Sequence, residues 1–117
     1  MKKFLLALLL VVFTVGMALT ASAATQNFDL YNMTGKIMVS LYIGPSGGNS
    51  WRSEDELGDF ALDHGAAVAI EFDPWDVARY WDIFVEFNDG SALEYDHFDL
   101  FSISKITLKK GGVAVCE

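Results

Sequence analysis

The chain has 117 residues and a formal net charge of −8 at pH 7, from 8 basic and 16 acidic side chains. An acidic surface repels phosphate backbones and anionic lipids, so we expect no nucleic-acid partner. The charge favours cationic partners or metal ions, or it serves only to keep the protein soluble.

The N-terminal segment has the pattern of a secretory leader. A basic start is followed by an apolar run over residues 4–18, and Ala21 and Ala23 occupy the small-residue positions of a cleavage site. The run is short for a bilayer span, which takes roughly 20 apolar residues, so a signal anchor is the weaker alternative. We predict a signal peptide over residues 1–23 and one β domain over 24–117, periplasmic or secreted and without stable membrane association after cleavage.

Removal of the leader takes two lysines and no acid, so the formal charge changes from −8 to −10. The remaining 94 residues suffice for one hydrophobic core. Cys116 is the single cysteine, which excludes an internal disulfide. We expect a monomer, or a weak dimer linked through Cys116, although a terminal thiol without a role is the simpler interpretation.

Alternating apolar residues predict the first strands. Residues 28–33 form the first, and residues 36–43 form the second, which we expect to pair with it as a hairpin across Thr34 and Gly35. One face of the second strand is expected to carry Ile37, Val39, Leu41 and Ile43.

The middle of the chain is less regular. A Gly/Pro/Ser/Asn-rich loop over 44–50 is followed by a helical turn at most, capped by Ser53. Residues 60–62 are a short strand candidate, and 67–72 alternate as a strand that Pro74 ends.

The strongest local signal is a hairpin over residues 80–98, with its turn at Asn88-Asp89-Gly90. Trp81, Ile83, Val85 and Phe87 fall on one face of its first strand. A last strand over 103–109 and an edge pairing at 113–115 complete the chain. Six to eight short strands without a helical period predict an all-β fold, a small antiparallel β-sandwich or open barrel.

Several landmarks recur in order along the chain: Asn32-Met33-Thr34-Gly35, Leu41 to Ser46, Trp51, Leu57-Gly58, Leu62, His64-Gly65, Ile70, Phe72, Tyr80-Trp81-Asp82, Phe98-Asp99-Leu100 and Ser104 to Leu108. In these the chain resembles a family of small exported bacterial proteins of unknown function. Some members carry an argininosuccinate lyase label, which this chain does not support, because such lyases are large helical oligomers. Similar proteins often have two cysteines where this chain has Arg79 and Phe101, so no family disulfide carries over.

Catalysis finds little support. His97 lies among carboxylates, but strand alternation puts Tyr95 and His97 on one face and Glu94 and Asp96 on the other. His64 lies in a turn, and two histidines without a cysteine pair give no zinc spacing. No phosphate loop, dinucleotide fingerprint or nucleophile motif is present, so we expect no enzyme and no cofactor, with a small hydrolase as the weakest alternative.

Calcium is the better metal candidate, because it takes several oxygen ligands. Asp73, Asp76 and Asp89 lie in loops and are the candidate ligands. No loop has the Asp-x-Asp-x-Asp-Gly order, and a hairpin turn accounts for Asp89. A calcium-stabilised module is therefore the alternative function.

A binding or structural module without catalysis is the main expectation, with an unknown protein or small molecule as its partner. Tyr42, Trp51, Trp75 and Tyr80 are the candidate contacts. Exposure of both tryptophans side by side would favour a ligand patch, and burial of both a structural role. The sequon at Asn32 is interpreted as a plain turn.

Overall fold

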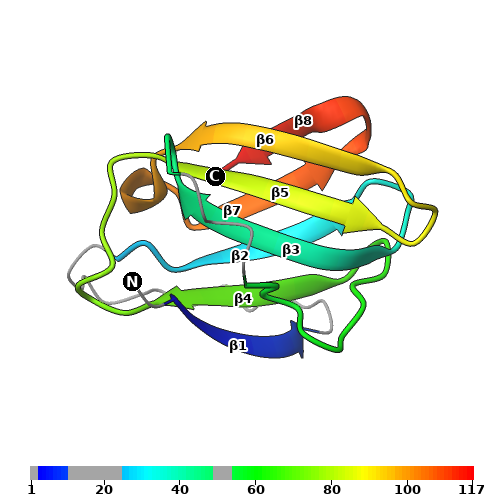
Figure 1. Cartoon of the computed structure of the whole chain (residues 1–117), viewed down its shortest axis with the longest axis horizontal. Coiled ribbons are helices and arrows are strands. Elements are labelled where there is room, and N and C mark those ends of the chain that lie inside the picture. Colours follow the sequence, from blue (N-terminus) through cyan, green and yellow to red (C-terminus); the bar gives the residue numbers. More distant parts are fainter. Residues whose placement is uncertain (1–2, 11–24, 49–53) are drawn as a thin grey trace.

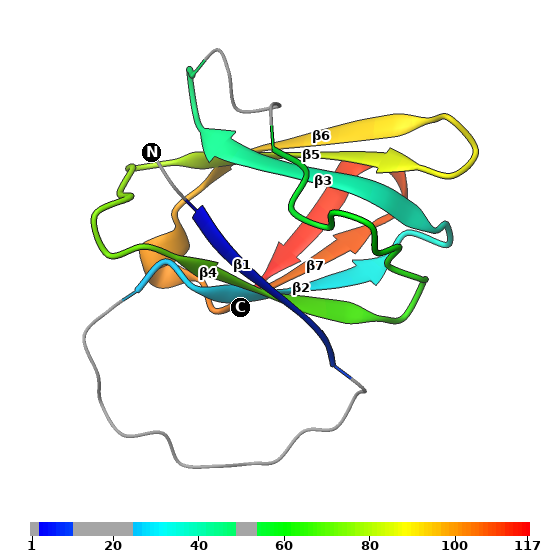
Figure 2. The ribbon, with the colours of Figure 1, turned by 60° about the horizontal axis from the view of Figure 1, so that its bottom comes forward.

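The computed structural model describes the backbone of residues 3–10 and all atoms of residues 25–48 and 54–117. These residues form two β-sheets that face each other as a sandwich (Figures 1 and 2). The larger sheet has the order β1-β4-β2-β7-β8, and the smaller has the order β3-β5-β6. The all-β sandwich predicted from the sequence is confirmed.

The strands of the larger sheet are β1 (Lys3–Leu10), β4 (Ala67–Phe72), β2 (Phe28–Met33), β7 (Lys105–Lys109) and β8 (Val113–Cys116). Those of the smaller sheet are β3 (Met38–Pro45), β5 (Trp81–Phe87) and β6 (Ala92–Phe98). Two short 3₁₀ turns, η2 (Leu100–Ser102) and η3 (Lys110–Gly112), follow β6 and β7. The ladders are antiparallel except that β2 and β7 run parallel.

The core lies between the inner faces of the two sheets. Alternate residues of β5 are buried as the sequence predicts, and this strand pairs with β6 across the expected turn. The opposing sheet contributes Leu30, Ile70, Ile106 and Leu108, each almost fully buried. Continuous burial of this kind supplies most of the folding free energy of a domain without a disulfide.

The predicted hairpin between residues 28–33 and 36–43 is wrong. β2 lies in the larger sheet between β4 and β7, whereas β3 lies in the smaller sheet beside β5. Period-two alternation identifies the buried face of a strand but not its partner, because both sheets present the same kind of inner face. The Thr34-Gly35 turn therefore carries the chain from one sheet to the other.

A β-bulge changes the face of one predicted core residue. The β3–β5 register passes from Met38 opposite Phe87 to Ser40 opposite Glu86, so Val39 is the extra residue. Met38 is buried and Val39 is 37% exposed, the reverse of the prediction. One inserted residue exchanges the buried and exposed faces in the part of the strand that precedes it.

Residues 3–10 of the predicted leader are a strand here, β1, which pairs with β4 at the edge of the larger sheet. The small residues before the predicted cleavage point, and Ser53 and Trp51, lie outside the described residues. Cleavage stays a prediction. Within the described part of the chain, no helix is long and apolar enough to cross a membrane.

Candidate functional site

The outer face of the smaller sheet carries a group of acidic and aromatic side chains. Tyr42 on β3 lies opposite Phe84 on β5, and Phe84 lies opposite Glu94 on β6. Asp82 is two residues before Phe84 on the same face, and Asp96 is two residues after Glu94. We call these five residues the acidic–aromatic face.

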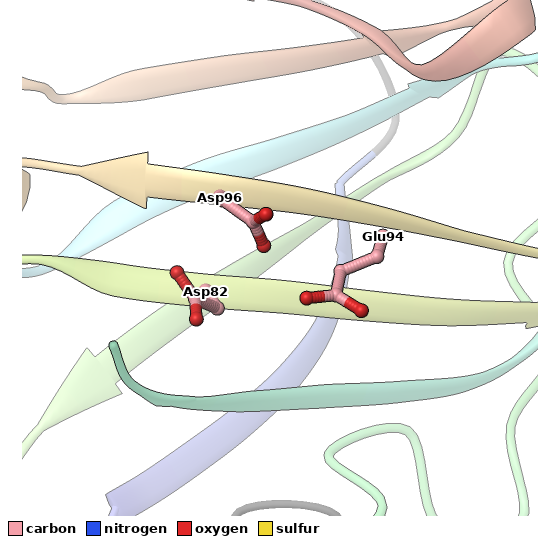
Figure 3. A group of neighbouring side chains, drawn as sticks. All are labelled: Asp82, Glu94 and Asp96. Carbon is pink, nitrogen blue, oxygen red and sulfur yellow. The ribbon is translucent and has the colours of Figure 1, made fainter. Parts of the chain in front are cut away.

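Three carboxylates converge on this face. Asp82, Glu94 and Asp96 each offer an oxygen within 4.8 Å of the others (Figure 3). Glu94 and Asp96 are exposed and Asp82 is half-buried, so a partner can approach them from solvent. Like charges this close repel one another, and a cation placed among them relieves that repulsion.

A bulge in β6 lies directly beyond these side chains. Trp81 lies opposite Phe98 while Ile83 lies opposite Tyr95, so three steps on β6 match two on β5. His97 takes a φ of 67°, which is uncommon for a residue other than glycine. Its exposed side chain and the buried Tyr95 therefore face opposite ways, and the prediction that both share one face is wrong.

Asp82 anchors the bulge. One of its carboxylate oxygens accepts the His97 N–H at 3.1 Å and the Ser46 hydroxyl at 2.6 Å. These contacts fix the orientation of the Asp82 carboxylate beside β6. The site is thus built from β5, the β6 bulge and the end of β3.

Aromatic rings border the carboxylates. The Tyr42 and Phe84 rings lie 6.1 Å apart, and the Tyr80 ring stacks on His97 at 5.0 Å. The Arg79 guanidinium lies 5.2 Å from the Tyr80 ring centre, a distance suited to a cation–π contact. A positive group therefore already occupies one aromatic ring at the border of this face.

Two of the four predicted contact aromatics belong to this region, Tyr42 on the face and Tyr80 beside it. Trp75 lies in the turn after β4 and is 74% exposed. Trp51 lies outside the described residues, so the expected comparison of the two tryptophans stays open. The sequence indicated these aromatic residues and placed Glu94 and Asp96 on one face, but it did not bring Asp82 to them, because that depends on the β5–β6 register.

The predicted calcium ligands are not brought together. Asp73 and Asp76 share the turn after β4, at the opposite end of the sandwich from the β5–β6 turn that carries Asp89 (Figure 1). Asp89 accepts from the Ser91 hydroxyl and pairs with the Lys36 amine at 3.0 Å. These contacts hold the pKa of Asp89 well below its usual range. Asp89 thus stabilises the hairpin turn.

A hollow at the end of the sandwich that carries the β5–β6 turn is a weaker candidate for a binding site. It measures about 520 Å³ and is lined by Phe87, Leu93, Lys36 and Lys110 among others. The amine of Lys36 already binds Asp89 and Ser91, so this cation serves the hairpin turn. Beside the acidic–aromatic face, Glu94, Asp96 and His97 also line an open hollow of about 400 Å³ that reaches β8.

His64, the other candidate for chemistry, has a structural contact. Its Nδ1 accepts the Gly35 N–H at 2.9 Å, at the turn where the chain crosses between the sheets.

Comparison of the chain with family models, curated proteins and solved structures finds no match in any of the three.

Proposed function

We propose that this protein is an exported binding module without catalysis, and that it recognises a basic protein segment through the acidic–aromatic face. The observation that carries the proposal is the convergence of Asp82, Glu94 and Asp96 within 4.8 Å beside half-buried aromatic rings. Lysine and arginine side chains complement both features, because they pair with carboxylates and lie over aromatic rings.

The chain's own cations support this chemistry. The Lys36 amine lies 5.4 Å from the Phe87 ring centre, and the Lys105 amine lies 4.6 Å from that of Tyr31. With Arg79 over Tyr80, three basic residues of this acidic protein lie over aromatic rings. A formal charge of −10 after cleavage adds long-range attraction for a basic partner and speeds its encounter.

Titration of the domain with a hexa-arginine peptide at low and moderate salt tests the proposal. We expect saturable one-to-one binding that weakens as salt rises, since the Debye length falls to about 10 Å at 0.1 M. The triple variant D82N/E94Q/D96N is expected to bind at least about tenfold more weakly.

A charge-matched control separates recognition from general attraction. E54Q/D59N/D63N removes three exposed acids elsewhere and leaves the same net charge. The proposal requires this control to bind within about threefold of the unmodified protein. Equal losses in the two triple variants would reduce the interaction to nonspecific charge attraction and overturn the proposal.

Calcium binding is the second candidate, favoured by the same three carboxylates, since calcium prefers oxygen ligands. Calorimetric titration with calcium chloride distinguishes the two. One-to-one calcium binding that D82N/E94Q/D96N abolishes, without binding of the peptide, would replace the basic partner with the metal.

A further inference from the structure

β1 occupies an edge that processing would open. It pairs antiparallel with β4, with Lys3 opposite Phe72 and Leu6 opposite Ala69. β1 is the outermost strand of the larger sheet (Figure 1). It lies wholly within the predicted leader, so a chain cleaved after Ala23 has lost it. β4 then becomes an edge strand.

We propose that the processed protein accepts a β-strand from another polypeptide at this β4 edge. The accepted strand is an extended apolar segment with a basic N-terminal end, running antiparallel to β4. The inference rests on the export and cleavage contained in the proposed function. It concerns the larger sheet, on the other side of the sandwich from the acidic–aromatic face.

The backbone of β4 provides the first argument. The Phe72 N–H donates to the Asn27 side chain at 2.8 Å, which places it on the β2 side of the strand. Backbone groups alternate along a strand, so those of Ala69 and Glu71 point toward β1. Without β1 they form an unpaired row of donors and acceptors, which is a template for another strand.

The side chains of β4 define the occupant. Val68, Ile70 and Phe72 belong to the buried core, so a strand laid beside them extends an apolar inner face. The outer face at this edge has the small side chain of Ala69, which leaves room for a neighbour. An apolar strand added at this edge therefore continues both the inner and the outer face of the larger sheet.

Charge sets the direction. Glu71 and Asp73 are half-buried at the end of β4 where the N-terminal end of β1 lies. An antiparallel occupant brings its own N-terminal end to these two acids. The leader, with lysines before its apolar run, has the order that this edge favours.

The domain produced directly as residues 24–117 provides the test. A labelled peptide with the sequence of residues 2–10 and an uncharged Gly/Ser tail is titrated into it. We expect one-to-one binding, with new hydrogen-exchange protection at Ala69 and Glu71. A peptide with Leu6→Pro lacks the N–H that faces Ala69 and should bind at least tenfold more weakly.

Two protein variants form a matched pair. Ala69→Pro removes an edge N–H at a position where an edge strand tolerates proline, and Ala69→Thr keeps the N–H. Equal peptide affinities for the two folded variants would overturn the proposal. If Ala69→Pro does not fold, the two peptides still decide the question on the unmodified domain.

Other outcomes of the peptide titration also test the proposal. Protection at β3, β6 or β8 instead of β4 would overturn the proposal, as would a dimer whose β4 edges pair and exclude the peptide. D82N/E94Q/D96N should bind the peptide unchanged, and a loss there would assign the peptide to the acidic–aromatic face. The mass of the exported protein tests cleavage separately. A mass that retains residues 1–23 would overturn this inference, whereas failure of the acidic–aromatic face to bind a basic peptide would overturn only the proposed function.

Discussion

The buried side chain of Gln26 accepts the indole N–H of Trp81 at 2.8 Å and joins two segments that are distant in the sequence. Its amide nitrogen donates to the Asp76 carbonyl at 2.6 Å, so one side chain holds both β5 and the turn after β4. Gln26 lies only three residues beyond the predicted cleavage point. The predicted mature N-terminus is therefore anchored in the core.

Gln26→Ala should destabilise the domain. It leaves the Trp81 N–H and the Asp76 carbonyl without this partner in a buried site, which costs about 1–3 kcal/mol for each unsatisfied group. Urea unfolding of residues 24–117, followed by tryptophan fluorescence, measures the loss. Thr25→Ala, at an exposed neighbour, should change the free energy of unfolding by less than about 0.5 kcal/mol. Equal stability of Gln26→Ala and Thr25→Ala would show that the Gln26 contacts contribute nothing.

Asn32 supports a second prediction, because its side chain is fully buried and uses all its hydrogen-bonding groups. Its nitrogen donates to the carbonyls of Lys36 and Leu62 at 2.8 Å each, and its oxygen accepts twice from Thr34. Asn32→Asp keeps the acceptor but replaces both donors with a buried charge. We expect a loss of at least about 2 kcal/mol by urea unfolding.

The neighbouring side chain is the control for this site. Met33 is exposed, so Met33→Thr should unfold within about 0.5 kcal/mol of the unmodified domain. A fully stable Asn32→Asp would contradict the structural role of the amide. The sequon interpretation agrees with this geometry, since a folded chain does not present the buried Asn32 nitrogen for glycosylation.

Local pattern predicted the elements better than their partners. The 80–98 hairpin could be predicted because its turn residues and its buried face both lie within one short stretch. The position of β3 was not, because Asn32 and the Thr34-Gly35 turn send the chain to the other sheet through contacts with residues near 62–66. Such long-range hydrogen bonds leave no local signal.

The candidate site was also only partly predictable, because it too depends on which strands are neighbours. Tyr42 and Tyr80 could be named from their residue type, whereas the meeting of Asp82 with Glu94 and Asp96 follows from the β5–β6 register, which places Phe84 opposite Glu94. Histidine at positive φ has no dependable sequence signature, and strict alternation gave the wrong face for it. A bulge is stabilised by tertiary contacts, here those of Asp82 with the His97 N–H.

Tyr95 gives the domain a dependence on alkaline pH. Burial raises the pKa of Tyr95 in the folded protein, while the unfolded chain titrates near the ordinary value of about 10. The unfolded state therefore loses its proton first, and the stability from this group is complete below about pH 10 and falls as pH rises above it.

Tyr95→Phe tests this linkage. The variant loses the hydrogen bond that the Tyr95 hydroxyl donates to the Lys109 carbonyl at 3.2 Å, and should be less stable by about 0.5–1.5 kcal/mol at pH 7. Its disadvantage should shrink between pH 9 and 11 in urea unfolding, about one unit either side of that pKa. A gap that stays constant over this range would contradict the assignment. Tyr42→Phe, on the outer face, is the control.

Cys116 decides whether the protein forms a covalent dimer. It lies exposed on the edge strand β8, opposite Ile106, and partial burial raises the pKa of its thiol. The thiolate is the reacting species, so oxidation to a dimer should be slow at pH 7 and faster at pH 9.

Native mass spectrometry of residues 24–117 after air oxidation measures this dimer. We expect it to dissociate with reductant and to be absent in Cys116→Ser, whose unfolding free energy should match that of the reduced protein. Because neither core contacts nor the β4 edge involve Cys116, peptide binding at that edge should persist in Cys116→Ser. A dimer that survives both reductant and this substitution would be noncovalent, and the thiol would then have no part in it.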